Sequence, residues 1–265
     1  TNHEKPRYVT SMTTSSGSTD PQKTVYIYPF ESIEPPSDGN TENCQEVVLA
    51  DGTIDFLCSE TGNTTGAAIY PQLESANMIN QPVMVQQYNV ENTQDALVAT
   101  TFTDYGSDKQ PVTIYTSKKD NPLESRMTFE LYDTPNDGGN LLQARQEDGT
   151  PVSFIWGYDH RYVVAKITNM EYGDIPVTYI NQIRSNSNSG NQTGLLQALR
   201  NLQNNAALSQ SFMTYYTYTP NIGVTTMTDE TGYRMSYFYD HLQRLKRVED
   251  ATGNVLSENE YNYKN

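Results

Sequence analysis

A short segment near the end of the chain recurs after 21 residues, and this interval constrains the fold more than any other feature. Asp229-Glu-Thr-Gly232 returns as Asp250-Ala-Thr-Gly253, so the Asp and the Gly each recur at the same spacing. A fixed period of this size is typical of a repeat architecture in which each unit is one supersecondary element. Asp and Gly favour turns. The unit is therefore predicted to be a β-hairpin.

Paired tyrosines mark the expected strands. Side chains two residues apart in a strand point to the same face, so each pair places two rings side by side. The rings bury a large apolar area, while the hydroxyls reach water or the backbone of a turn. We expect Tyr261-Asn-Tyr263 to take the place that Tyr237-Phe-Tyr239 holds one unit earlier. The pairs are Tyr26/Tyr28, Tyr216/Tyr218, Tyr237/Tyr239 and Tyr261/Tyr263.

Composition excludes several classes of partner. The chain has 265 residues and a net charge of −15, with 32 Asp and Glu against 17 Lys and Arg. No Lys/Arg cluster is present to neutralise phosphates, which argues against nucleic acid and against an anionic membrane surface. The sequence contains no apolar run of about 18 residues that could span a bilayer. The chain starts without Met and shows no signal peptide, so we interpret it as a fragment of a longer exported protein whose signal was removed.

Short strand-like runs separated by turn signals at intervals of about ten residues predict an all-β fold. We expect antiparallel β-hairpin repeats that form a large twisted or curled meander sheet. The predicted domains are a weakly repeat-like β region at 1–125 and a hairpin-repeat region at 126–265. The strand candidates outside the tyrosine-rich C-terminal repeats are residues 7–12, 24–28, 82–88, 97–105, 112–117 and 126–132.

One helical insertion, 193–208, is predicted inside the repeat region. Residues 185–191 form a polar break before it, and Thr193 can cap the helix. Three leucines then share one face, and Ala206 continues the stripe. We favour a surface helix that packs these leucines on the neighbouring sheet over a helix that binds a partner. The leucines are Leu195, Leu199 and Leu202.

The repeated stretch resembles the YD-repeat, or RHS-repeat, family. The family unit begins with Tyr-Asp, continues through Gly-Arg-Leu and Asp-x-x-Gly, and ends at the next Tyr. Gln243 stands here where the family has Gly, and Asn262 stands where it has the next Asp. A looser unit runs from Asp148-Gly149 through Tyr158-Asp159 to Lys166-Ile167, and Tyr132-Asp133 resembles a degraded one. The residues that match the family pattern are Tyr239, Asp240, Arg244, Leu245, Asp250, Gly253 and Tyr261.

This resemblance implies a non-enzymatic scaffold. Proteins of the family are exported and wind their hairpins into a hollow shell, which in some encloses a C-terminal toxin and in others serves contact at the cell surface. It implies an extracellular or cell-surface location, with further repeats, a toxin cargo or a cell-surface glycan as partners. The alternative is a carbohydrate-binding or adhesion module. The expected structural residues are Gly149, Trp156, Tyr158, Asp159, Gly232, Tyr237, Tyr239, Asp240, Arg244, Gly253, Tyr261 and Tyr263.

Two cysteines flank a predicted hairpin whose turn contains Asp51-Gly52. A three-residue loop places Cys44 opposite Cys58, whereas a two-residue loop places Cys58 opposite Gln45. A disulfide is therefore a geometric possibility that depends on register, and two free buried thiols are the alternative.

No catalytic, cofactor-binding or metal-binding motif is evident. His160 and His241 each follow a Tyr-Asp, and we expect both to be turn-exposed histidines rather than parts of an Asp-His dyad. Residues 132–140 have a faint calcium-loop composition, but a turn with Asn, Asp and Gly at positive φ is favoured. The stripe Phe154/Trp156/Tyr158 is expected to fill the space between hairpins, with a sugar-binding platform as the alternative. A glycosidase-like site would need two facing carboxylates, and the sequence selects none.

Overall fold

A computed structural model describes residues 11–14, 21–28, 44–48, 54–58, 73, 75–78, 81–91, 94–119, 121 and 123–261. The chain divides into two compact units, Thr1–Thr128 and Phe129–Asn265. Its predicted class is confirmed, because the described strands form an antiparallel sheet in which they follow chain order, except that residues 44–48 and 54–58 form a separate pair. None of the described helices is long and apolar enough to cross a lipid bilayer.

The first unit is built from hairpins around a small apolar cluster that includes Leu73, Met84 and Phe102. β3 (Cys44–Val48) and β4 (Ile54–Cys58) form a separate two-stranded sheet in which Cys44 lies opposite Cys58 in register, as a three-residue loop predicts. The disulfide itself stays a prediction. The strands are β1 (Ser11–Thr14), β2 (Gln22–Ile27), β3 (Cys44–Val48), β4 (Ile54–Cys58), β5 (Met84–Glu91), β6 (Gln94–Tyr105), β7 (Pro111–Lys118) and β8 (Glu124–Tyr132), the last of which contains the boundary between the units.

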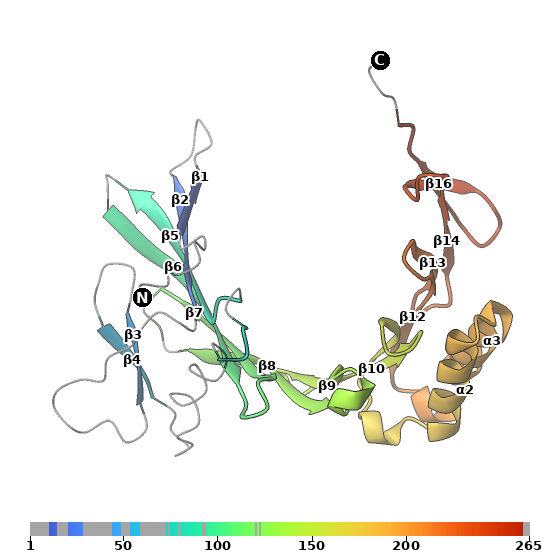
Figure 1. Ribbon diagram of the computed structural model, residues 1–265, viewed down its shortest axis with the longest axis horizontal. Helices are drawn as coiled ribbons and strands as arrows, with labels where there is room; N and C mark the ends of the chain where they lie inside the picture. Colours follow the sequence, from blue (N-terminus) through green and yellow to red (C-terminus); the bar gives the residue numbers. More distant parts are fainter. Residues whose placement is uncertain are drawn as a thin grey trace. The chain divides into compact units, whose positions relative to one another are not determined.

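The second unit contains the tyrosine-rich strands and both α-helices (Figure 1). Strands β9 to β16 pair in chain order, each antiparallel to the next. Their bounds are β9 (Leu141–Gln146), β10 (Pro151–Gly157), β11 (Tyr162–Thr168), β12 (Phe212–Thr219), β13 (Gly223–Thr228), β14 (Arg234–Tyr239), β15 (Leu245–Glu249) and β16 (Val255–Glu258). The helices are α2 (Val177–Asn188) and α3 (Gln192–Gln203), and the 3-10 turns are η1 (Pro135–Asp137), η2 (Tyr172–Asp174) and η3 (Ala206–Leu208).

The helical insertion is larger than the sequence predicts. Helix α2 was not predicted, because its sequence is mostly polar and buries only Ile180, Ile183 and Ser187. It also includes most of the expected polar break, which is reduced to residues 189–191. The N-terminal cap of α3 is Asn191 rather than Thr193, since the Asn191 side chain accepts a hydrogen bond from the Gly194 N–H.

The leucine stripe of α3 packs as predicted. Leu195, Leu199 and Leu202 are fully buried, in one cluster with strand residues such as Ile167 and Met213. Figure 1 shows both helices on one side of the strands around β12. The predicted stripe ends earlier than expected, because α3 stops at Gln203 and Ala206 is exposed. Full burial of each leucine contributes about 1.5–3 kcal/mol, so α3 is a structural cover for the sheet.

Candidate functional site

Three hairpin turns of the second unit share one hydrogen-bonding pattern. In each turn the backbone N–H of the first residue, an Asp, donates to the carbonyl four residues later. The Asp Oδ1 accepts from the backbone N–H groups two and four residues later, at 2.8–2.9 Å. The fourth residue has φ between +62° and +88°. This is a type I turn followed by a left-handed bulge residue. The turns begin at Asp229, Asp240 and Asp250, and their left-handed residues are Gly232, Gln243 and Gly253.

The 21-residue interval therefore contains two copies of one turn. The Tyr-Asp signal at Asp240 and the Asp-x-x-Gly signals at Asp229 and Asp250 read as different motifs in the sequence, but they fold identically. The same backbone pattern recurs at residues 146–150, where Gly149 is the left-handed residue. There the Asp sits at the third position, and Asp148 accepts from the Thr150 N–H.

These turns hold their carboxylates in the charged form. The hydrogen bond from the Arg244 guanidinium lowers the pKa of Asp240 to about 2. Asn254 lowers the pKa of Asp250, and Thr231 does the same for Asp229. Arg244 also lies over the ring of Tyr261, 4.1 Å from the ring centroid. Asp240 and Arg244 thus join a turn to the aromatic residue that follows β16.

One tyrosine per repeat bonds to the backbone of the neighbouring strand. The hydroxyl of Tyr218 on β12 donates to the Val163 carbonyl of β11 at 2.9 Å. Tyr239 on β14 donates to Val224 of β13 at 2.9 Å, and Tyr261 donates to Leu245 of β15 at 2.9 Å. These bonds correct the predicted alignment of the repeats. Tyr261 takes the structural place of Tyr239 rather than that of Tyr237, because it makes the equivalent bond to the preceding strand.

The remaining predicted aromatics have different surroundings. Tyr237 is half-buried, and its hydroxyl lies 3.9 Å from the Met227 sulfur, which is a weak contact. Burial raises the pKa of Tyr218 to about 12. Tyr263 lies outside the described residues.

Tyr158-Asp159 is not the structural counterpart of Tyr239-Asp240, although the sequence predicts that it is. Strand β10 ends at Gly157, after a register shift between Ile155 and Trp156. Tyr158, Asp159 and His160 all have φ between +53° and +63°. Asp159 is exposed, and its backbone N–H donates to the side chain of Asn188 instead of closing an Asp turn. The chain therefore turns toward the helices at this point.

Tyr158 instead anchors the insertion to the sheet. Its ring is buried and meets the rings of Tyr162 and Tyr218 edge-on, with centroids 5.8 Å and 5.7 Å away. Its hydroxyl accepts a 2.9 Å hydrogen bond from the Tyr218 N–H. The Gln192 side chain of α3 also donates to this hydroxyl, at 3.1 Å. One oxygen thus connects helix and strand.

The aromatic stripe predicted at residues 154–158 is divided by this turn. Phe154 and Trp156 lie half-buried on β10, whereas Tyr158 belongs to the cluster beneath the helices. The Trp156 indole donates to the Leu141 carbonyl at 2.7 Å, so its polar atom is already used. The three rings therefore do not form one platform for a sugar.

A pair of carboxylates does exist, and the sequence did not select it. Glu130 of β8 and Glu171 before η2 both accept hydrogen bonds from Arg145 and Gln143 of β9. The hydrogen bond from Arg145 lowers the pKa of Glu130. A glycosidase acid needs a raised pKa, so this arrangement has the character of an ion-pair network.

The histidines behave differently from one another. His241 is exposed in its turn, as predicted. His160 is not simply exposed, because its Nδ1 lies 3.3 Å from the carboxylate of Asp133, in a loop whose Gly138 and Gly139 have positive φ. That loop is a turn with a 3-10 segment, as favoured. His3 lies outside the described residues, and the described residues contain no group of three or more His, Cys, Asp or Glu that could hold a metal ion.

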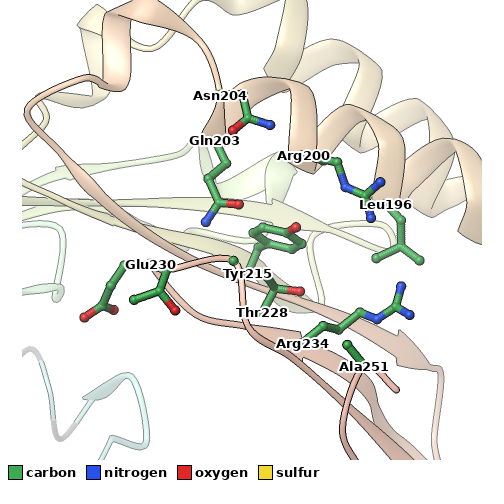
Figure 2. Close-up of a pocket in the computed structure, with 11 residues that line it drawn as sticks. Leu196, Arg200, Gln203, Asn204, Tyr215, Thr228, Glu230, Arg234 and Ala251 are labelled. Atoms are coloured by element: carbon green, nitrogen blue, oxygen red, sulfur yellow. The ribbon is translucent and has the colours of Figure 1, made fainter. Parts of the chain in front are cut away.

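A pocket of about 430 Å³ lies between α3 and the strands β12 to β14 (Figure 2). Gly232 of its lining was selected from the sequence as a turn residue, but no pocket was predicted here. Its floor is a row of Tyr215, Thr228 and Arg234, which are cross-strand neighbours in the register of the three strands. Arg200 and Gln203 of α3 form part of the wall.

Comparison with known proteins finds structural similarity only. No family model and no curated protein matches the chain. A crystal structure of TcdB2-TccC3 without the hypervariable C-terminal region matches 90% of this chain and 13% of its own, with 10% identity and a TM-score of 0.34. A second, TcdB2-TccC3-TEV, matches 89% of this chain and 13% of its own, with 10% identity and a TM-score of 0.32. This chain thus spans about an eighth of those chains. Similarity at these scores carries no argument about function, and membership of the RHS/YD-repeat family stays a prediction from the motifs.

Proposed function

We propose that this chain is a non-catalytic scaffold segment, one stretch of wall in a larger exported protein of the RHS/YD-repeat type. The observation that carries the proposal is the recurrence of one turn and one tyrosine-to-carbonyl bond along β12 to β16. A hairpin alone is marginally stable. The recurring turn and the recurring tyrosine-to-carbonyl hydrogen bond each join a strand to its neighbour. Residues used in this way build an extendable sheet.

The distribution of chemical groups supports the same function. The carboxylates that recur with the repeat are each bound to the backbone of their own turn, and Asp240 also binds Arg244. The recurring tyrosine hydroxyls are bound to backbone carbonyls. The hydrogen bonds of these groups therefore stabilise the turns and the sheet. Enclosure of a toxin cargo, other repeats as partners and a location outside the cell are further parts of the proposal.

An in-register duplication tests the scaffold role. A second copy of residues 229–249 inserted after Glu249 preserves the spacing of the Asp turns. We expect the longer chain to fold and to show a larger denaturant m-value, because an added hairpin buries additional surface. A Gly/Ser insert of equal length at the same site is the control. A duplication that lowers stability as much as the Gly/Ser insert would show that the sheet is not extendable.

The sequence of the parent protein tests export and cargo. We expect an export signal before this segment and a toxin-like domain after the repeats. A parent protein with neither would remove those parts of the proposal and leave the scaffold role standing.

A further inference from the structure

The pocket beside α3 contains polar groups that the fold leaves unpaired. Thr228 is 2% exposed, and its hydroxyl is buried without a hydrogen-bond partner among the described residues. The Nε of Arg234 is likewise buried and unpartnered. The two residues face each other directly across β13 and β14. A buried donor without a partner is costly, and native proteins rarely retain one without a reason.

Two arginines line this pocket, and neither is paired with a carboxylate of the described residues. Arg234 comes from β14 and Arg200 from the last turn of α3. Neither forms an ion pair with any described residue, although the chain has 32 acidic residues to offer. In Figure 2 both guanidinium groups end on the same side of the pocket, next to Leu196, and Glu230 lies at the opposite end. The two cations therefore create a local positive region on a strongly acidic chain.

The rest of the lining favours an organic ligand. Leu196, Ala251 and the ring of Tyr215 provide apolar lining, and the volume of about 430 Å³ suits a small molecule. Guanidinium groups bind carboxylates through paired, charge-assisted hydrogen bonds. The Thr228 hydroxyl can donate to the same oxygens.

We propose that this pocket binds a small organic carboxylate, held by Arg200, Arg234 and Thr228, with its carbon body against Leu196 and Tyr215. The residues that hold the ligand in this proposal make none of the turn or tyrosine hydrogen bonds that carry the scaffold role, although residues of the Asp229 and Asp250 turns also line the pocket. The ligand completes the hydrogen bonding that the fold leaves open.

Titration calorimetry on the full 265-residue chain tests the site, with glutarate as the probe. Glutaramide has the same length without charge, and inorganic phosphate carries charge without a carbon body. We expect glutarate to bind, and the variants Arg200→Gln and Arg234→Gln each to weaken it by about tenfold or more. Arg161→Gln, a change at a cation outside the pocket, is the matched control and should leave binding unchanged.

Four results would overturn the proposal. They are the absence of glutarate binding, equal binding of glutaramide, equal or tighter binding of phosphate, and equal loss in the Arg161→Gln variant. Because Arg234→Gln alters a half-buried strand position, thermal unfolding of each variant is measured alongside. Arg200 is exposed on α3, so its replacement leaves the fold intact and tests binding by itself.

Discussion

The hydroxyl of Tyr239 donates a 2.9 Å hydrogen bond to the carbonyl oxygen of Val224 on the adjacent strand. The same hydroxyl occupies the space above Gly223, where an added Cβ would lie 2.4 Å from it. Tyr218 and Tyr261 make the equivalent bonds to Val163 and Leu245. The bond is therefore a property of the repeat, and it explains why tyrosine rather than phenylalanine occurs at these positions.

Tyr239→Phe removes this bond while the ring remains. We expect a loss of about 0.5–1.5 kcal/mol in the free energy of unfolding, which is the usual net value of one hydrogen bond. Tyr237→Phe is the matched control, since its hydroxyl makes only the weak contact to the Met227 sulfur. Urea unfolding of the two variants measures the difference. Equal losses in both would show that the Tyr239 bond contributes nothing specific.

The turn at Gln243 offers a stabilising change. Gln243 adopts φ +62°, and the equivalent Gly253 adopts φ +88°. A left-handed conformation costs a residue with a side chain about 1–2 kcal/mol. Gln243→Gly should therefore stabilise the chain, by less than this amount because glycine also gains freedom in the unfolded state.

The reverse substitution is the matched test. Gly253→Gln places a side chain in the same turn conformation, and a Cβ at Gly253 meets no atom within 4 Å. No steric clash then adds to the cost of the backbone conformation, and we expect a loss of less than about 1–2 kcal/mol in urea unfolding, because removing Gly also lowers the freedom of the unfolded chain. If both substitutions shift stability in the same direction, the turns are not equivalent.

These turns show what the sequence could and could not predict. The recurrence of Asp229 and Gly232 as Asp250 and Gly253 predicted the hairpins, because turn chemistry is local. The residues from Asp240 to Gln243 also favoured a turn, but its equivalence to the other two turns was not predicted, since Gln243 stands where a Gly would indicate the left-handed position. Tyr158 failed as a repeat residue for a non-local reason. It bonds to Tyr218, sixty positions away, and no local pattern encodes that contact.

The helices and the pocket show the same contrast between local sequence patterns, which can be predicted, and contacts between distant residues, which cannot. The leucines of α3 repeat at helical spacing and were predicted, whereas α2 buries so few apolar side chains that its period is faint. The pocket combines α3 with β12 to β14, so it depends on how distant segments pack. Arg200 and Arg234 form no ion pair with a described residue, and no sequence pattern indicates this.

Acid should unfold the chain in part through Asp240. Hydrogen bonds from Arg244 lower the pKa of this carboxyl to about 2, below the value of about 3.9 for an unfolded chain. Its stabilising contribution is therefore fully present above the unfolded pKa and is lost as the pH falls from about 4 through about 2. Asp240→Asn should be less stable than the parent chain at pH 7, and this difference should shrink over that window.

Urea midpoints measured from pH 7 to pH 2 check this expectation. Glu230→Gln is the control, because Glu230 is an exposed carboxylate in the neighbouring turn with no ion pair to a described residue. A difference between Asp240→Asn and the parent chain that stays constant down to pH 2 would mean that the charge on Asp240 is not the source of its effect.

The contact between α2 and β10 depends on the absence of a side chain at Gly157. A Cβ there would lie 2.5 Å from the Ser187 hydroxyl and 3.0 Å from both the Ser187 Cβ and a Val164 methyl. The backbone of Gly157 is not left-handed, so the cost of Gly157→Ala comes from crowding, about 1–3 kcal/mol. Ser187→Gly removes two of the three contacts, at its own cost of about 1 kcal/mol in a helix.

A double-mutant cycle separates crowding from other effects. If the close approach of α2 explains the loss, the double variant should be more stable than the sum of the single losses predicts, by about 0.5 kcal/mol or more. The Ser187 hydroxyl also accepts a hydrogen bond from the Tyr158 N–H, and Ser187→Gly removes that bond in both arms of the cycle, so it cancels. If the losses of the two single variants are strictly additive, the crowding at Gly157→Ala comes from Val164 and not from Ser187. Helix α2 can then move away from the sheet at little cost.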